Sequence, residues 1–193
     1  FWVVRETLKP IDLEKLDNYF QTLVQTAGEN IKSLYRTRCI HCDSQGDGLY
    51  VFWVRYVKCL FCGENVYLFK RTFLNKGLSR NKPPSRANPA TVFCPKCFAL
   101  NEWYGKDDCS CRSCNHVFKP QAGTYDQGYY TCSQCHKNRI SLIQTLETGQ
   151  RLHEKLVTIE YWCPRCRDRC YKSPDEEDLT NISRIEETIK EKN

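Results

Sequence analysis

Apolar residues recur at helical spacing near the start of the chain, and this stripe predicts an amphipathic helix. Asp12 precedes the stripe and is suited to cap the helix, while Gly28 lies inside it and is expected to bend or break it. We expect the stripe to pack as core rather than to serve as a surface for a partner. Its members are Leu13, Leu16, Phe20, Leu23, Val24, Ala27, Ile31 and Leu34.

A second, shorter stripe follows Pro174. The acidic run Asp175–Asp178 suits the first turn of a helix, because negative charge is favourable near a helix N-terminus. We therefore predict an acidic C-terminal helix within residues 173–193, packed against the first helix. Residues 1–38 are assigned to a leading strand and the amphipathic helix. The second stripe comprises Leu179, Ile182, Ile185 and Ile189.

Between these helices the pattern changes to short β-branched and aromatic runs bounded by turn residues, which is typical of strands. The clearest runs are Leu49–Lys58 and Asn65–Phe69, and residues 141–147 fit a single helical turn. Residues 70–86, which are rich in Pro, Asn and basic residues, are predicted to form a loop. Further strands are predicted at Val117–Lys119, Tyr129–Thr131 and Leu156–Trp162.

Cysteines interrupt these strands in a regular way. Twelve of the 14 cysteines fall in six Cys-x-x-Cys pairs, and each pair at a tight turn presents half of a tetrahedral metal site. The sequence predicts a small, metal-dominated α+β fold in which residues 39–172 form zinc ribbons with three closed Cys₄ sites, one Zn²⁺ in each. Cys109 and Cys170 are left over. The predicted ligands are Cys39, Cys42, Cys59, Cys62, Cys94, Cys97, Cys111, Cys114, Cys132, Cys135, Cys163 and Cys166.

Other uses of cysteine fit this pattern less well. A disulfide scaffold is usually shorter and has less regular spacing, and a thioredoxin-like motif needs one pair rather than six. Iron also suits a four-thiolate site, so it stays open as an alternative metal. Reduced thiols predict a cytoplasmic protein.

We call each Cys-x-x-Cys turn a knuckle and number the six knuckles in chain order. The sequence does not decide which two knuckles share a metal ion. The gap between Cys114 and Cys132 fits a hairpin, which favours pairing the fourth knuckle with the fifth. The long strand before Cys59 carries it away from Cys42, which favours second with third and first with sixth. Sequential pairing stays open, because the gap from Cys97 to Cys111 also fits a short hairpin.

The charge pattern changes the picture once the metal is counted. The formal net charge of the 193 residues is +6, but three zinc sites with four thiolates each would add −6, which leaves the metal-loaded chain near neutral.

One segment has a local excess of positive charge, because no acidic residue occurs between Asn65 and Asn101. This segment is either a DNA-contacting loop or a solvated surface loop. The candidate DNA contacts are Lys70, Arg71, Lys76, Arg80, Lys82 and Arg86. Phe73, Trp103 and Tyr104 are candidates for stacking on an exposed base or for core packing.

Taken in order, several segments resemble the zinc-ribbon insertion of adenine-specific DNA methylases that contain a zinc ribbon, a prokaryotic family. The resemblance covers nearly the whole chain and implies a host enzyme with a Rossmann-type fold that transfers a methyl group from S-adenosylmethionine to a base amino group. The absence of an initiator Met or a signal-peptide layout likewise suggests an excerpt from a longer protein. The segments are ETLKPIDLEKL, YVFWVRYVKCLFCGENVYLF, VFCPKC, VFKPQAGTYDQGYYTC, IEYWCPRC and YKSPDEED.

Two features of that family do not occur in this chain: a Gly-rich cofactor loop after a strand, and a Pro-Pro-aromatic motif for the target base. No catalytic residue is therefore assigned, and a closed Cys₄ site leaves zinc no position for a substrate. We expect a module that contacts DNA or helps recognise the target, with DNA and the rest of the methyltransferase polypeptide as partners and no membrane association. The alternative is a structural spacer or a protein-docking domain.

Overall fold

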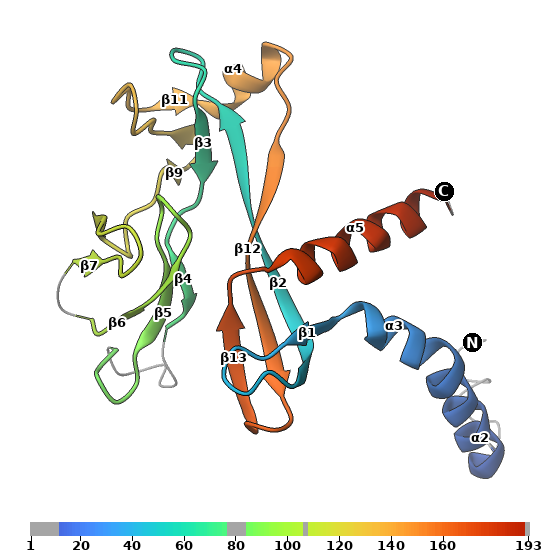
Figure 1. Ribbon diagram of the computed structural model, residues 1–193. Helices are drawn as coiled ribbons and strands as arrows, with labels where there is room; N and C mark the ends of the chain where they lie inside the picture. Colours follow the sequence, from blue (N-terminus) through green and yellow to red (C-terminus); the bar gives the residue numbers. More distant parts are fainter. Residues whose placement is uncertain (1–11, 77–83, 106–107, 192–193) are drawn as a thin grey trace, which may run out of the picture.

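The computed structural model describes residues 12–76, 84–105 and 108–191. A long antiparallel pair, β2 (Gln45–Lys58) with β12 (His153–Cys163), runs through the molecule (Figure 1). The ladder extends from Tyr56 opposite His153 to Asp47 opposite Trp162. Both strands were predicted from their apolar, β-branched composition, and both are longer than predicted. Because an extended residue advances about 3.3 Å, the two ends of β2 lie far apart.

Three shorter strands complete this five-stranded sheet. β13 (Asp168–Lys172) pairs with the free edge of β12, while β1 (Arg36–Arg38) and β3 (Asn65–Leu68) pair with opposite ends of β2. The first knuckle lies between β1 and β2, and the second lies between β2 and β3. The long ladder therefore holds these two knuckles at opposite ends of one sheet.

The remaining strands form smaller ribbons. β4 (Phe73–Asn75), β5 (Ala90–Phe93) and β6 (Leu100–Trp103) make one sheet, and β7 (Cys109–Ser110) pairs with β8 (Val117–Phe118). A third sheet comprises β9 (Tyr125–Asp126), β10 (Tyr129–Tyr130) and β11 (Ile140–Ser141), and α4 (Leu142–Glu147) follows it. The predicted helical turn at 141–147 is confirmed by α4.

Among the described residues, the hydrophobic core is divided into four small clusters. Three of them are built around buried cysteines of the knuckles. Only the central cluster, which includes Val54, Phe69 and Val157, contains no cysteine. A core divided in this way buries little apolar surface at any one place, so ribbons of this size depend on another source of stability.

The predicted N-terminal helix is present as α2 (Leu13–Leu23), a π-helical turn η1 (Val24–Gly28) and α3 (Glu29–Leu34). Asp12 caps it as predicted, because its carboxylate accepts a hydrogen bond from the Lys15 N–H at 3.0 Å. The irregular turn ends at Gly28, where a bend or break was predicted. The predicted leading strand lies outside the described residues.

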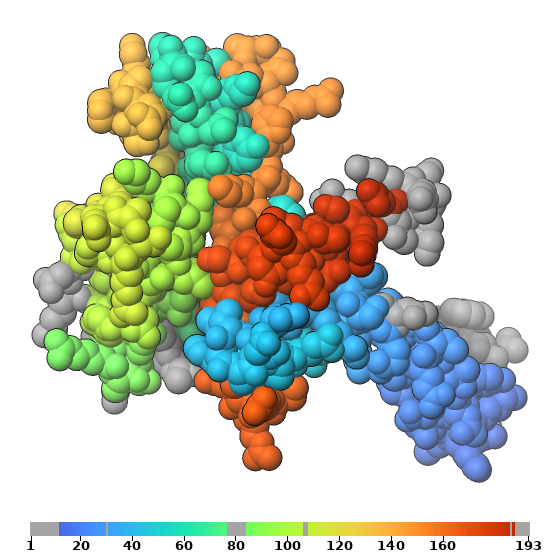
Figure 2. All heavy atoms as spheres, in the orientation of Figure 1, coloured from blue at the N-terminus to red at the C-terminus, as the bar shows by residue number. Residues whose placement is uncertain are grey.

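The expectation that this helix packs as core is wrong for the described chain. No residue of α2 is buried, and Phe20 is 57% exposed. Figure 2 shows α2 projecting from the body of the protein. At the other end of the helix, α3 contacts the C-terminal helix. The helical spacing of apolar residues identified the apolar face of this helix correctly, but it does not indicate what packs against that face.

The C-terminal helix α5 (Glu176–Glu191) is anchored to the sheet by a buried ion network. Lys172 ends β13, and its Nζ lies 2.5 Å from Asp175 and 2.8 Å from Asp178 while also donating to Thr37 Oγ1 at 3.0 Å. The Lys172 and Asp178 side chains are each 3% exposed. Burial lowers the pKa of Lys172, but the hydrogen bonds and charges of Asp175 and Asp178 outweigh this and raise it, so the lysine stays charged.

In the described part of the chain, each helix is too short or too polar to cross a bilayer.

We expect Lys172→Met to lower the free energy of unfolding by about 3–5 kcal/mol, because Asp175 and the buried Asp178 lose their counter-charge. Chemical denaturation of the zinc-loaded protein measures this. Arg55→Met is the matched control: Arg55 pairs with Glu154 at 3.1 Å, but both side chains are more than half exposed, so the cost is below about 1 kcal/mol. Equal losses in the two variants would contradict a special role for the buried network.

Candidate metal centres

The structure gathers the twelve knuckle cysteines into three groups of four, and within each group all sulfur atoms lie within 4.8 Å of one another. The pairing is nested: the first knuckle meets the sixth, the second meets the fifth, and the third meets the fourth. We call the groups the outer, middle and inner sites. They are Cys39, Cys42, Cys163 and Cys166; Cys59, Cys62, Cys132 and Cys135; and Cys94, Cys97, Cys111 and Cys114.

The spacing of the sulfur atoms fits a tetrahedral metal site. A tetrahedron with zinc–sulfur bonds of about 2.3 Å has edges of about 3.8 Å. The sulfur–sulfur distances between knuckles include 3.7 Å for Cys94–Cys114 and 3.6 Å for Cys62–Cys132. The outer site has 3.8 Å for Cys39–Cys166. A disulfide would require about 2.0 Å, and all 14 cysteines are free thiols.

Each knuckle is formed by the same tight turn. The residue four positions after the first cysteine has a positive φ angle in every knuckle. In the second knuckle that residue is Gly63, whose N–H donates to the Cys59 carbonyl at 2.9 Å. Glycine adopts this left-handed conformation without cost, whereas the other five residues do so at some expense. They are Asp43, Phe98, Asn115, His136 and Arg167, with φ between 54° and 63°.

Local hydrogen bonds and burial together divide the thiols into easily and poorly ionised ones. The Ser44 hydroxyl and the Cys166 N–H lower the pKa of Cys163 to about 6. Burial opposes ionisation of Cys111, but the N–H groups of Cys114 and Ser113 lower its pKa to about 6. Burial raises the pKa of Cys94 to about 12. Since a metal binds the thiolate, loading must displace protons from thiols such as Cys94, and acidification favours release of the metal.

Besides Ser44, two side chains outside the knuckles donate hydrogen bonds to ligand sulfurs. The fully buried Tyr161 donates its hydroxyl to Cys39 Sγ at 3.6 Å and accepts the Ile40 N–H at 3.1 Å. The buried Asn101 donates from Nδ2 to Cys111 Sγ at 3.7 Å and accepts the Arg112 N–H at 2.9 Å. Partners of this kind stabilise thiolate charge and fix ligand geometry. Sequence reasoning missed both, because neither lies in a knuckle.

The favoured pairing is confirmed for the first and sixth knuckles and wrong for the other four. Of the sequential alternative, the pairing of the third knuckle with the fourth is confirmed and the rest is wrong. The predicted hairpin between the fourth and fifth knuckles does not form, because β8 pairs with β7 instead. The chain then crosses the β3–β4 connection, where the Thr72 N–H donates to the Pro120 carbonyl and the Thr124 N–H donates to the Phe69 carbonyl, both at 3.0 Å. This crossing carries the fifth knuckle to the second.

The predicted DNA contacts fall in two categories. Lys70, Arg71, Lys76 and Arg86 are exposed, and no ion pair to them is found among the described residues. Arg80 and Lys82 lie outside the described residues. The structure therefore places four of the six candidates on the surface, next to the strands β4 and β5.

These features define a small α+β protein with antiparallel sheets and three cysteine groups that could hold metal ions. The spare residues Cys109 and Cys170 are buried and belong to none of the three groups. No family model, no curated protein and no solved structure matches this chain.

Proposed function

We propose that this chain is a zinc-binding module with three structural Zn²⁺ ions, and that it contributes DNA contact to an S-adenosylmethionine-dependent DNA methyltransferase. The zinc assignment is carried by the three groups of four thiols at tetrahedral spacing. Each site uses four protein ligands, so the zinc has a structural role. The cofactor and the chemistry belong to the proposed host enzyme.

The DNA contact rests on uncompensated positive charge. Several arginines and lysines elsewhere are paired with carboxylates, as Arg38 is with Asp43 and Glu177, and Arg169 with Glu160. Lys70, Arg71 and Lys76, in contrast, are exposed and lack such partners among the described residues. Unpaired cations on one ribbon are suited to the phosphate backbone, which attracts them independently of base sequence.

We expect the triple change Lys70→Gln, Arg71→Gln and Lys76→Gln to weaken binding to duplex DNA across unrelated sequences. The slope of log affinity against log salt is expected to flatten by about 0.9 for each phosphate that the variant no longer neutralises. Fluorescence anisotropy with a labelled duplex at several salt concentrations measures both effects. The matched control replaces Lys15, Lys32 and Arg151, which are exposed and lie in other parts of the chain, outside the knuckles.

Equal affinity and equal salt slope in the two triple variants would remove the support for DNA contact. The second candidate, a protein-docking domain, would then take the lead. One observation favours it: the apolar face of α2 and α3 is open, with Leu13, Leu23 and Ile31 each more than half exposed. The partner proposed for that face is the rest of the methyltransferase polypeptide.

A further inference from the structure

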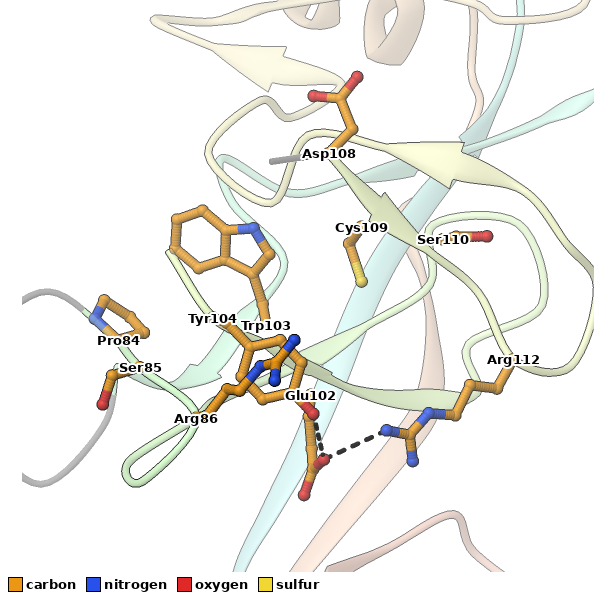
Figure 3. A pocket seen from close by; sticks show the side chains of 10 residues that line it. All are labelled: Pro84, Ser85, Arg86, Glu102, Trp103, Tyr104, Asp108, Cys109, Ser110 and Arg112. Carbon is orange, nitrogen blue, oxygen red and sulfur yellow. Dashed lines mark hydrogen bonds and ion pairs between the residues drawn. The ribbon is translucent and has the colours of Figure 1, made fainter. Parts of the chain in front are cut away.

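A cavity of about 670 Å³ lies beside the inner site, and none of the four cysteines of that site lines it. Figure 3 shows the side chains that line the cavity, the spare Cys109 among them. One wall is the segment Pro84–Arg86, and the other is formed by β6 and the chain from Asp108 to Arg112. The walls are held close together at Gly105, whose φ is +94° and where an added Cβ would lie 2.7 Å from the Pro84 carbonyl oxygen. The volume falls in the range of small-molecule sites.

Two aromatic rings line this cavity in fixed positions. Trp103 is half-buried, and its indole packs edge-on against Phe73 with ring centroids 5.4 Å apart. Tyr104 is 40% exposed, and its hydroxyl donates to the Glu102 carboxylate at 2.9 Å. Rings that are already held lose little freedom when a flat ligand stacks on them, so they are suited to a π-system.

The polar groups of the cavity provide donors, acceptors and one available positive charge. Arg112 pairs with Glu102 at 3.2 Å, so these two groups balance each other while still offering hydrogen bonds. Arg86 has no ion pair among the described residues. Figure 3 shows the Asp108 carboxylate directed away from Arg86 and Arg112. The guanidinium of Arg86 is therefore available for one anionic group.

A ligand that matches these features is flat and aromatic, carries donors and acceptors on its edge and has one negative charge. A nucleotide has all of these properties. We propose that this cavity binds one unpaired nucleobase of single-stranded DNA, with the base on Trp103 and Tyr104 and the phosphate on Arg86. The base must be unpaired, because a paired base exposes only its groove edges and cannot enter a concave site between two walls.

This inference rests on the proposed DNA contact and adds the form of DNA that the ribbon selects. The probe is a short fluorescein-labelled oligothymidylate, titrated with the zinc-loaded full chain. Tyr104→Ala is expected to weaken binding about tenfold, since one stacking platform is lost. Tyr104→Phe is expected to retain most of the affinity, because the ring is kept. Tyr50→Ala, which removes an exposed tyrosine on β2, is the matched control and should leave binding unchanged.

Arg86→Gln tests the phosphate contact in the same assay. It should weaken oligothymidylate binding about tenfold, while Arg151→Gln, which removes another exposed arginine, should have no effect. Tyr104 is exposed, so its loss is not expected to unfold the ribbon, and unchanged zinc content and circular dichroism verify this. Trp103→Phe keeps a ring against Phe73 and serves as a second variant with reduced stacking.

Unchanged oligothymidylate binding by both Tyr104→Ala and Arg86→Gln would overturn the cavity assignment. Equal weakening of duplex binding by Tyr104→Ala would also overturn it, because the site would then not select an unpaired base. The duplex experiment changes Lys70, Arg71 and Lys76, which lie outside the cavity. Its prediction can therefore be confirmed even if the cavity variants leave oligothymidylate binding unchanged. The two proposals are therefore tested separately.

Discussion

Removal of the metal is expected to unfold most of the chain. Three of the four core clusters are built around ligand cysteines. Without the ions, the buried thiolates in these clusters would repel one another or take up protons, and the clusters would lose the bonds that hold the facing knuckles together. Structural zinc contributes about 10–16 kcal/mol of apparent binding free energy in small modules, as much as the whole stability of a typical domain. Circular dichroism before and after chelation measures the effect, and elemental analysis should find three zinc ions per chain.

A chelator can reach each site through one solvent-exposed ligand. Each group contains one exposed cysteine, namely Cys166, Cys62 and Cys97, and the other ligands are buried or half-buried. A metal-free sample, verified by elemental analysis, that still unfolds in one cooperative thermal transition at the original temperature would contradict a structural role for the metal. One zinc or none in protein purified without added metal would contradict the three-site assignment, and iron in its place would correct the metal alone.

The nested pairing makes the effect of single ligand changes specific. Cys39→Ser is expected to release one zinc and to expose Cys42, Cys163 and Cys166 to alkylation, because a neutral hydroxyl replaces one of four thiolates. The middle and inner sites should keep their ions. Mass spectrometry of alkylated peptides, with elemental analysis of the same sample, identifies which thiols become reactive.

Cys170→Ser is the matched control. Cys170 is buried in the same cluster as Cys39 and Cys163, but it belongs to none of the four-thiol groups. This variant should therefore retain three zinc ions. If Cys39→Ser instead made Cys59 and Cys62 reactive, the first knuckle would be paired with the second and the nested arrangement would be wrong.

Much of this arrangement was predictable from local chemistry. The Cys-x-x-Cys spacing identified all six knuckles, and composition identified β2, β3 and β12. The length of β2 also indicated that Cys59 lies far from Cys42, and it led to the correct pairing of the first and sixth knuckles. These features depend on residues close in sequence or on simple strand geometry.

The middle pairing could not be predicted in this way, because it depends on the crossing near Gly123. The inner pairing was part of the sequential alternative, since the gap from Cys97 to Cys111 fits a short hairpin. An added Cβ at Gly123 would collide with the Phe69 carbonyl oxygen, so only glycine fits between these segments. In the sequence this glycine resembles any turn residue. The tight turn of each knuckle was predicted, but its left-handed residue was not, because five of the six left-handed positions carry residues other than glycine.

The nested order of the sites also determines how the protein can assemble as it is synthesised. Facing cysteines are separated by 14 positions in the inner site, 70 in the middle site and 121 in the outer site. The inner ribbon is therefore complete first on a growing chain, and closure of the widest loop from a disordered chain would cost about 2 kcal/mol more than closure of the narrowest. A metal ion bound at one site would shorten the loop that the next site must close, so we expect assembly to proceed from the centre of the chain outwards.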